Sequence, residues 1–228
     1  MSLSLNETQK YKEFYGSNLE QMPLLISGKN EEGEQLDVPR TPMPFAVLME
    51  RRVNSQLGDW GDNYFDLGDG IAYSTGTNFK VALDAPQLRS INPKTKLQNG
   101  ALILGDEEAY KIVNGEEFDR SQIILERPLT KTEAKAHPVL LALARGDKSL
   151  LNAYIDKTFT DANQRFNYDK NTGLYLASSQ NVPTMRAFVV YGLEGRSNVD
   201  GGSDLGDGNG RLVGLAPEAP SASAGQII

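Results

Sequence analysis

Two copies of one acidic pentapeptide are the residues whose types and spacing best suit chemistry in this chain. Residues 66–70 read Asp-Leu-Gly-Asp-Gly, residues 204–208 repeat this sequence, and each copy lies in a longer run of acids. Hard cations such as Ca²⁺ and Mg²⁺ prefer oxygen ligands, and glycine lets the backbone turn its carbonyl groups toward an ion. The pattern makes four residues candidate ligands for Ca²⁺ or Mg²⁺: Asp66, Asp69, Asp204 and Asp207.

The same pentapeptide is also typical of a plain turn. An aspartate accepts hydrogen bonds from its own backbone, and the following glycine adopts conformations that other residues avoid. Neither copy has the Asp-x-Asp-x-Asp-Gly spacing or the glutamate at the twelfth position of a calcium-binding EF-hand loop. We therefore favour turns without a cofactor and keep a Ca²⁺ or Mg²⁺ site as the alternative.

Three aromatic residues, Trp60, Tyr64 and Phe65, lie within the first acidic run. Aromatic rings beside acids in a loop are typical of surfaces that hold a sugar or a partner side chain. Large aromatic residues are also frequently buried, so the same three residues fit the end of a β-sheet core. The sequence leaves both interpretations open.

Familiar catalytic motifs are missing from the sequence. The chain has no cysteine, a single histidine, His137, and no Gly-x-Ser-x-Gly nucleophile elbow. The glycine run at residues 206–211 has arginine where a dinucleotide-binding loop has its third glycine. We assign no catalytic residue, expect a packing role for His137, and favour a function other than catalysis.

Composition and charge argue against nucleic acid and membranes as binding partners. The 228 residues carry a net charge of −7, and one short basic stretch contributes only Arg89, Lys94 and Lys96. Three positive charges neutralise too few phosphates for tight binding of nucleic acid. The longest apolar run, residues 138–144, is too short to cross a bilayer. We expect a protein that binds neither nucleic acid nor membrane, located in the cytoplasm or, if viral, in the virion.

Glycine-punctuated apolar segments predict an α+β fold with a mostly antiparallel β body, either a sandwich or a small barrel. Helices are expected near residues 130–160, because Thr130 and Glu133 form a capping box and Asp147 precedes an amphipathic pattern. We predict an arm at residues 1–22 with a short helix at 7–14, one domain at residues 23–214, and a flexible tail at 215–228. A short strand is expected at 24–26. The β-rich part spans residues 45–129, with strands at 45–54, 64–67, 71–74, 79–83, 101–104, 110–113 and 122–126. Strands at 174–177 and 186–191 return to the sheet.

Terminal arms and the lack of a catalytic motif favour a structural or interaction protein. We expect a homo-oligomer, or a subunit that joins other subunits in a larger assembly such as a virus-like particle. Two alternatives remain open. One is a hydrolase that uses Mg²⁺ or Ca²⁺ held by the Asp-rich loops. The other is a carbohydrate- or protein-binding module that uses the three aromatic residues.

Overall fold

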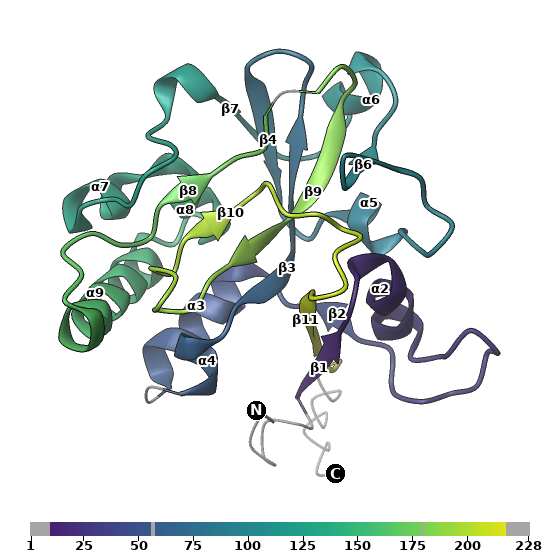
Figure 1. Ribbon diagram of the computed structural model, residues 1–228, viewed down its shortest axis with the longest axis horizontal. Coiled ribbons are helices and arrows are strands. Elements are labelled where there is room, and N and C mark those ends of the chain that lie inside the picture. The colour runs from purple at the N-terminus through teal and green to yellow at the C-terminus, as the bar shows by residue number, and fades with distance from the viewer. Residues whose placement is uncertain (1–9, 56–57, 179, 218–228) are drawn as a thin grey trace, which may run out of the picture.

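The computed structural model describes residues 10–55, 58–178 and 180–217, and these residues build one large sheet with helices on both faces (Figure 1). Within those ranges eleven strands are joined by hydrogen bonds, and the central path runs β1-β11-β3-β9-β10-β8. Most neighbouring strands are antiparallel, whereas β11 with β3 and β10 with β8 are parallel. The strands are β1 (Tyr11–Tyr15), β2 (Thr41–Pro42), β3 (Phe65–Tyr73), β4 (Asn78–Ala82), β5 (Leu97–Gln98), β6 (Ala101–Ile103), β7 (Glu116–Asp119), β8 (Leu174–Tyr175), β9 (Thr184–Val190), β10 (Val199–Asp200) and β11 (Arg211–Leu215).

The helices pack in two groups, so that the sheet has a core on each face. One core combines α3, α7, α8 and α9 with alternate residues of β3, and the other combines α2, α5 and α6 with β9 and β11. Among the described residues, no helix is both long enough and apolar enough to cross a membrane. The helices are α2 (Asn18–Ser27), α3 (Phe45–Asn54), α4 (Asp59–Asp62), α5 (Pro86–Arg89), α6 (Glu107–Lys111), the 3-10 turn η1 (Arg120–Gln122), α7 (Lys131–Ala136), α8 (Pro138–Leu143) and α9 (Lys148–Phe166).

The predicted α+β class and mostly antiparallel sheet are confirmed. So are the helix starts that depend on local caps. The Thr130 side chain accepts from the Glu133 backbone amide, and the Glu133 carboxylate accepts in return from the amide of Thr130. Asp147 caps α9, which continues to Phe166 rather than ending near residue 159. These signals act within one helical turn, and for that reason the sequence displays them directly.

Several predicted strands are wrong. Residues 45–54 form helix α3, because Phe45, Leu48 and Met49 recur at helical spacing and point into the core. Residues 24–26 belong to helix α2, which Ser17 caps and Gly28 ends in a left-handed conformation. Residues 110–113 overlap helix α6. Gln122 is the last residue of the turn η1, and residues 123–126 after it form no strand.

The first and last strands of the described residues, β1 and β11, pair with each other in the sheet. The helix predicted at residues 7–14 is wrong for its described part, because residues 11–15 form β1 and pair antiparallel with β11. The described part of the predicted arm, residues 10–22, therefore holds β1 and the first half of α2. Residues 1–9 of that arm and residues 218–228 of the predicted tail lie outside the described residues.

Candidate functional site

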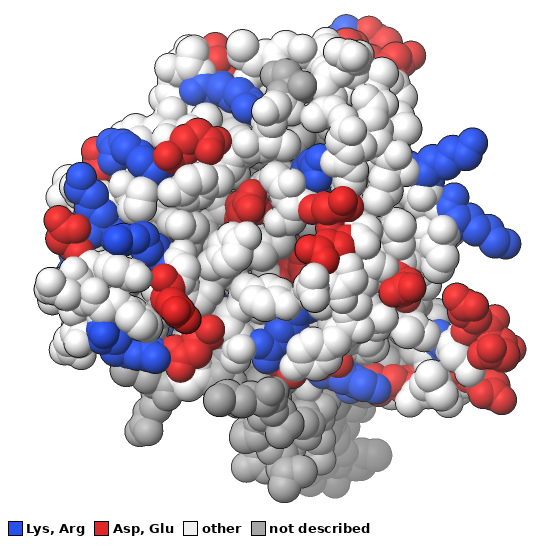
Figure 2. All heavy atoms as spheres, viewed as in Figure 1, with Lys and Arg blue, Asp and Glu red and all other residues white. Residues whose placement is uncertain are grey.

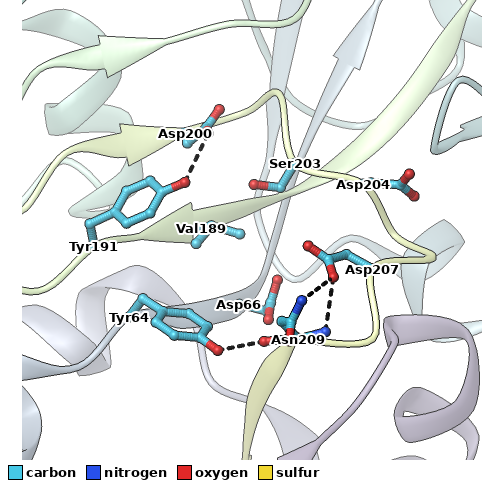
Figure 3. Close-up of a pocket in the computed structure, with 10 residues that line it drawn as sticks. Tyr64, Asp66, Val189, Tyr191, Asp200, Ser203, Asp204, Asp207 and Asn209 are labelled. Atoms are coloured by element: carbon cyan, nitrogen blue, oxygen red, sulfur yellow. Dashed lines mark hydrogen bonds between the residues drawn. The ribbon is translucent and has the colours of Figure 1, made fainter. Parts of the chain in front are cut away.

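An open pocket of about 400 Å³ lies beside the β10–β11 loop, residues 201–210 (Figure 3). This loop crosses one face of the sheet (Figure 1). Two neighbouring strands supply the base of the pocket. Asp66 on β3 is in register with Val189 on β9, and alternate residues of a strand share a face. Tyr64 lies two residues before Asp66 and Tyr191 two residues after Val189, so both lie beside this pair. The lining is Tyr64, Asp66, Val189, Tyr191, Asp200, Ser203, Asp204, Asp207, Asn209 and Gly210.

Asp66 forms the floor of the pocket and is only 4 % exposed. Its Oδ2 atom accepts a hydrogen bond from the backbone amide of Arg211 at 2.5 Å, and its Oδ1 atom receives a 3.4 Å contact from Asn18 Nδ2. The backbone amide of Asp66 also donates to the carboxylate. Burial raises the pKa of the Asp66 carboxyl group, and the negative charge of Asp207 raises it further. The floor is thus a carboxyl group whose ionised form is poorly solvated.

Short side-chain bonds hold the β10–β11 loop in shape. Asp200, Asp204 and Asp207 each accept from the amide two residues ahead, at 2.6, 2.7 and 2.9 Å. Each aspartate uses Oδ1 for this local turn. Beneath the loop, the buried guanidinium group of Arg186 donates to the carbonyl groups of Gly202 and Ser203, at 3.0 and 2.7 Å. These hydrogen bonds hold the loop in one conformation without a ligand.

Two tyrosines form the opposite wall (Figure 3). Tyr64 is 38 % exposed and Tyr191 is 39 % exposed, so both rings present accessible surface. The Tyr64 hydroxyl group donates to the Asn209 carbonyl oxygen, which joins the wall to the loop. Burial raises the pKa of Tyr191, and the neighbouring charges of Asp200, Asp66 and Asp207 raise it further. The Tyr191 ring therefore lies within the electric field of three carboxylates.

Three of the four predicted metal ligands line this pocket, and the fourth does not. Asp66, Asp204 and Asp207 come together there. The Asp204 carboxylate is turned toward Gly100, where an added Cβ would lie 2.3 Å from Asp204 Cγ. Asp69 is fully buried elsewhere. Within the described residues no three His, Cys, Asp or Glu side chains are grouped as a metal site would require, and the predicted Ca²⁺ or Mg²⁺ remains a prediction.

Asp69 instead caps a helix across space. Its Oδ2 atom accepts from the backbone amide of Phe45 at 2.7 Å, and its Oδ1 atom accepts from the amide of Asp84 at 2.9 Å. Helix α3 begins after Pro44, which has no side chain able to cap it. The Asp69 carboxylate therefore replaces the missing local cap and ties α3 to the turn after β4.

Of the three aromatic candidates, one reaches the pocket. Trp60 is 3 % exposed and packs on Tyr11 and Phe65, with ring centroids 5.2 and 5.5 Å apart. Phe65 is fully buried in the core beneath the sheet. Tyr64 alone lines the pocket, because it lies on the opposite face of the strand from Phe65.

Sequence reasoning missed Tyr191, Val189 and Ser203 as pocket residues. Tyr191 closes an apolar run that the sequence correctly indicates as a strand. Its position beside Asp66 depends on the β3–β9 register, which joins segments far apart in the chain. The acidic run around Asp200 was the one visible signal for this side of the pocket.

Comparison with known proteins supports the fold. No family model matches the sequence, and no curated protein matches it. A similar solved structure is described as "Accommodation of massive sequence variation in Nanoarchaeota by the C-type lectin fold". It superposes with a TM-score of 0.63 at 17 % sequence identity, over 91 % of this chain and 98 % of that chain. The chain therefore has the C-type lectin fold.

Proposed function

We propose that this chain is a binding module and that its ligand occupies the pocket between the two tyrosines and the β10–β11 loop. The observation that carries the proposal is the way the pocket is built. Two paired strands form its floor, and the β10–β11 loop forms one side. Hydrogen bonds to the loop's own aspartates and from Arg186 hold this loop in position. Concave sites of this kind, formed before binding and lined by a few polar groups, are typical of ligand pockets.

The similar structure supports the same function by analogy. It is described as accommodating massive sequence variation by the C-type lectin fold. A fold that tolerates such variation suits a module whose scaffold stays constant while a surface loop sets the choice of ligand. The predictions of an assembly subunit and of a metal-dependent hydrolase stay predictions, as do the cytoplasmic or virion location and the oligomer.

The test is a ligand screen with a blocked pocket as control. Ligand-observed NMR is run with a panel of neutral methyl glycosides, short peptides, amines and small carboxylic acids. Ser203→Trp places a large ring in the pocket, whereas Ser149→Trp places the same ring on the exposed first turn of α9. We expect one chemical class to bind the wild type and Ser149→Trp but not Ser203→Trp.

Two results would overturn the proposal. In the first, every probe that binds the wild type also binds Ser203→Trp equally well. In the second, no probe class binds at millimolar concentration. If Ser203→Trp does not fold, as judged by its amide spectrum, Tyr191→Ala replaces it, because this half-exposed ring can be removed without opening the core.

A further inference from the structure

The pocket has an unbalanced charge. Four of its ten lining residues are aspartates, and none is lysine, arginine or histidine. Figure 2 shows acidic side chains gathered near the middle of the face that carries the loop. Uncompensated carboxylates that line a concave, partly desolvated surface attract cations more strongly than the same groups in open solvent.

The nearest guanidinium groups are held elsewhere. Arg211 pairs with Glu13, and its guanidinium group stacks over Phe65 on the other face of the sheet. Arg186 donates to carbonyl oxygens under the loop, among them that of Asn99. Burial raises the pKa of Asp200 and the charge of Arg186 partly opposes this rise, but Arg186 is not among the main influences on Asp66. Neither of these two arginines therefore pairs with the floor carboxylate of Asp66.

A second observation, independent of the number of acids, concerns the Asp66 carboxylate itself. It is more than nine-tenths buried, and the contact that its Oδ1 atom receives from Asn18 is 3.4 Å long, near the limit of a hydrogen bond. A buried carboxylate oxygen ordinarily receives a short bond, and leaving one weakly bonded is costly. A donor that enters from the pocket would satisfy it.

The tyrosine wall indicates what kind of donor fits. In Figure 3 the rings of Tyr64 and Tyr191 stand on one side of Asp66, with Asp207 across from them. Aromatic faces bind weakly hydrated organic cations, and guanidinium groups in particular combine stacking with hydrogen bonds to carboxylates. A strongly hydrated metal ion gains little from such a wall.

Building on the proposed function, we propose that the group recognised in this pocket is an organic cation, an ammonium or guanidinium group. It lies against the rings of Tyr64 and Tyr191 and donates hydrogen bonds to Asp66 and Asp207. The same chemistry can come from a lysine or arginine side chain on the surface of a partner protein or from a free amine. The two sources differ in what surrounds the cation, and the test separates them.

The experiment compares charged probes with neutral probes of the same shape. Butylguanidinium and butylammonium are titrated into the full chain at low ionic strength, beside butylurea, and dissociation constants are taken from amide shifts. We expect both cations to bind at least about tenfold more tightly than butylurea, the size of effect that one charge-assisted hydrogen bond provides. Gly-Arg-Gly against Gly-citrulline-Gly repeats the comparison in a peptide, and tighter binding of Gly-Arg-Gly than of butylguanidinium identifies a protein side chain as the source.

Matched variants locate the binding. Asp207→Asn removes one exposed carboxylate of the pocket and should weaken cation binding about tenfold, whereas Asp169→Asn makes the same change on the exposed segment after α9 and should leave it unchanged. Tyr191→Leu keeps an apolar wall without a ring face and should weaken binding about threefold.

Other outcomes overturn the inference in distinguishable ways. Neutral glycosides that bind in the pocket, are blocked by Ser203→Trp and ignore Asp207→Asn would refute the cation but keep the binding module. Displacement of the cations by Ca²⁺, reversed by a chelator, would make the pocket a metal site instead. Equal affinity for butylguanidinium and butylurea would also refute the recognition of an organic cation. If nothing binds in the pocket, the proposed function fails together with the inference.

Discussion

The pentapeptide Asp-Leu-Gly-Asp-Gly occurs in two regions with opposite surroundings. Residues 66–70 lie inside the long strand β3, where all five are buried. Residues 204–208 lie in the β10–β11 loop, where only Leu205 is buried. Identical residues therefore serve two different structural tasks, and the difference lies in what the rest of the chain places around them.

The aspartates show the contrast most clearly. In the loop, Asp204 and Asp207 bond to backbone amides two residues ahead. In the strand, Asp66 and Asp69 bond to amides from distant segments, those of Arg211 and Phe45. In the extended strand the short bonds of these two side chains therefore come from tertiary neighbours. In both copies the aspartates therefore accept hydrogen bonds from backbone amides, but the motif does not determine which segment of the chain supplies those amides.

The largest expected difference in stability is between the aspartates at the fourth position of the two copies, Asp69 and Asp207. Asp69→Ala leaves the buried amide of Phe45 and the partly buried amide of Asp84 without an acceptor and removes the cap of α3. We expect a loss of about 3 kcal/mol in the free energy of unfolding, measured by urea denaturation. Asp207→Ala should change it by less than about 0.5 kcal/mol, because it breaks only an exposed turn. Equal losses in the two variants would contradict the contrast.

The fifth position should give the next largest effect. A Cβ at Gly70 would lie 2.9 Å from Leu88 Cδ1 and 3.2 Å from the Arg186 carbonyl oxygen, whereas a Cβ at Gly208 would have no neighbour within 4 Å. We expect Gly70→Ala to lower the free energy of unfolding by about 1–3 kcal/mol through overpacking. Gly208→Ala should be neutral or slightly stabilising. Thermal unfolding of both variants, each against the wild type, measures this difference.

A smaller effect concerns pH at the first position. Burial raises the pKa of Asp66 above its value in the unfolded chain, so its stabilising contribution is present below about pH 4 and is lost as the pH rises through the folded pKa. Asp66→Asn carries no such charge. We expect the free energy of unfolding of this variant to rise relative to wild type as the pH increases above about 4. The same slope in Asp204→Asn would show that net charge, rather than burial, causes it.

The smallest expected effect is a shift in the pKa of Asp66, in the first copy, caused by the charge of Asp207, in the second. The charge of Asp207 raises the pKa of Asp66 across the pocket. Asp207→Asn should therefore lower the pKa of Asp66, by less than burial raises it. An NMR titration of the Asp66 carboxyl carbon in both proteins measures the shift, with Asp169→Asn as the matched change outside the pocket. An unchanged Asp66 titration would show that the two carboxylates do not interact.

Elements with local signals could be predicted, and elements capped or paired over a distance could not. The capping box at Thr130 and the Asp147 cap lie within three residues of the amides that they bind. Helix α3 lacks such a cap, since Pro44 precedes it and its acceptor is Asp69, 24 residues along the chain. Its apolar run therefore resembled a buried strand, because short apolar runs fit either structure.

The candidate site divides in the same way. The sequence alone determined the class of the fold, the local helix caps, and the residue types that meet in the pocket: aspartates, glycines and a tyrosine in two related runs. Only the tertiary structure decided that Asp66 and Asp207 share a pocket, that Asp69 caps α3, and that Tyr191 completes the wall. The physical reason is that the β3–β9 register and the parallel pairing of β11 with β3 join segments distant in sequence. Strand pairing of this kind depends on the packing of the whole sheet rather than on any local pattern.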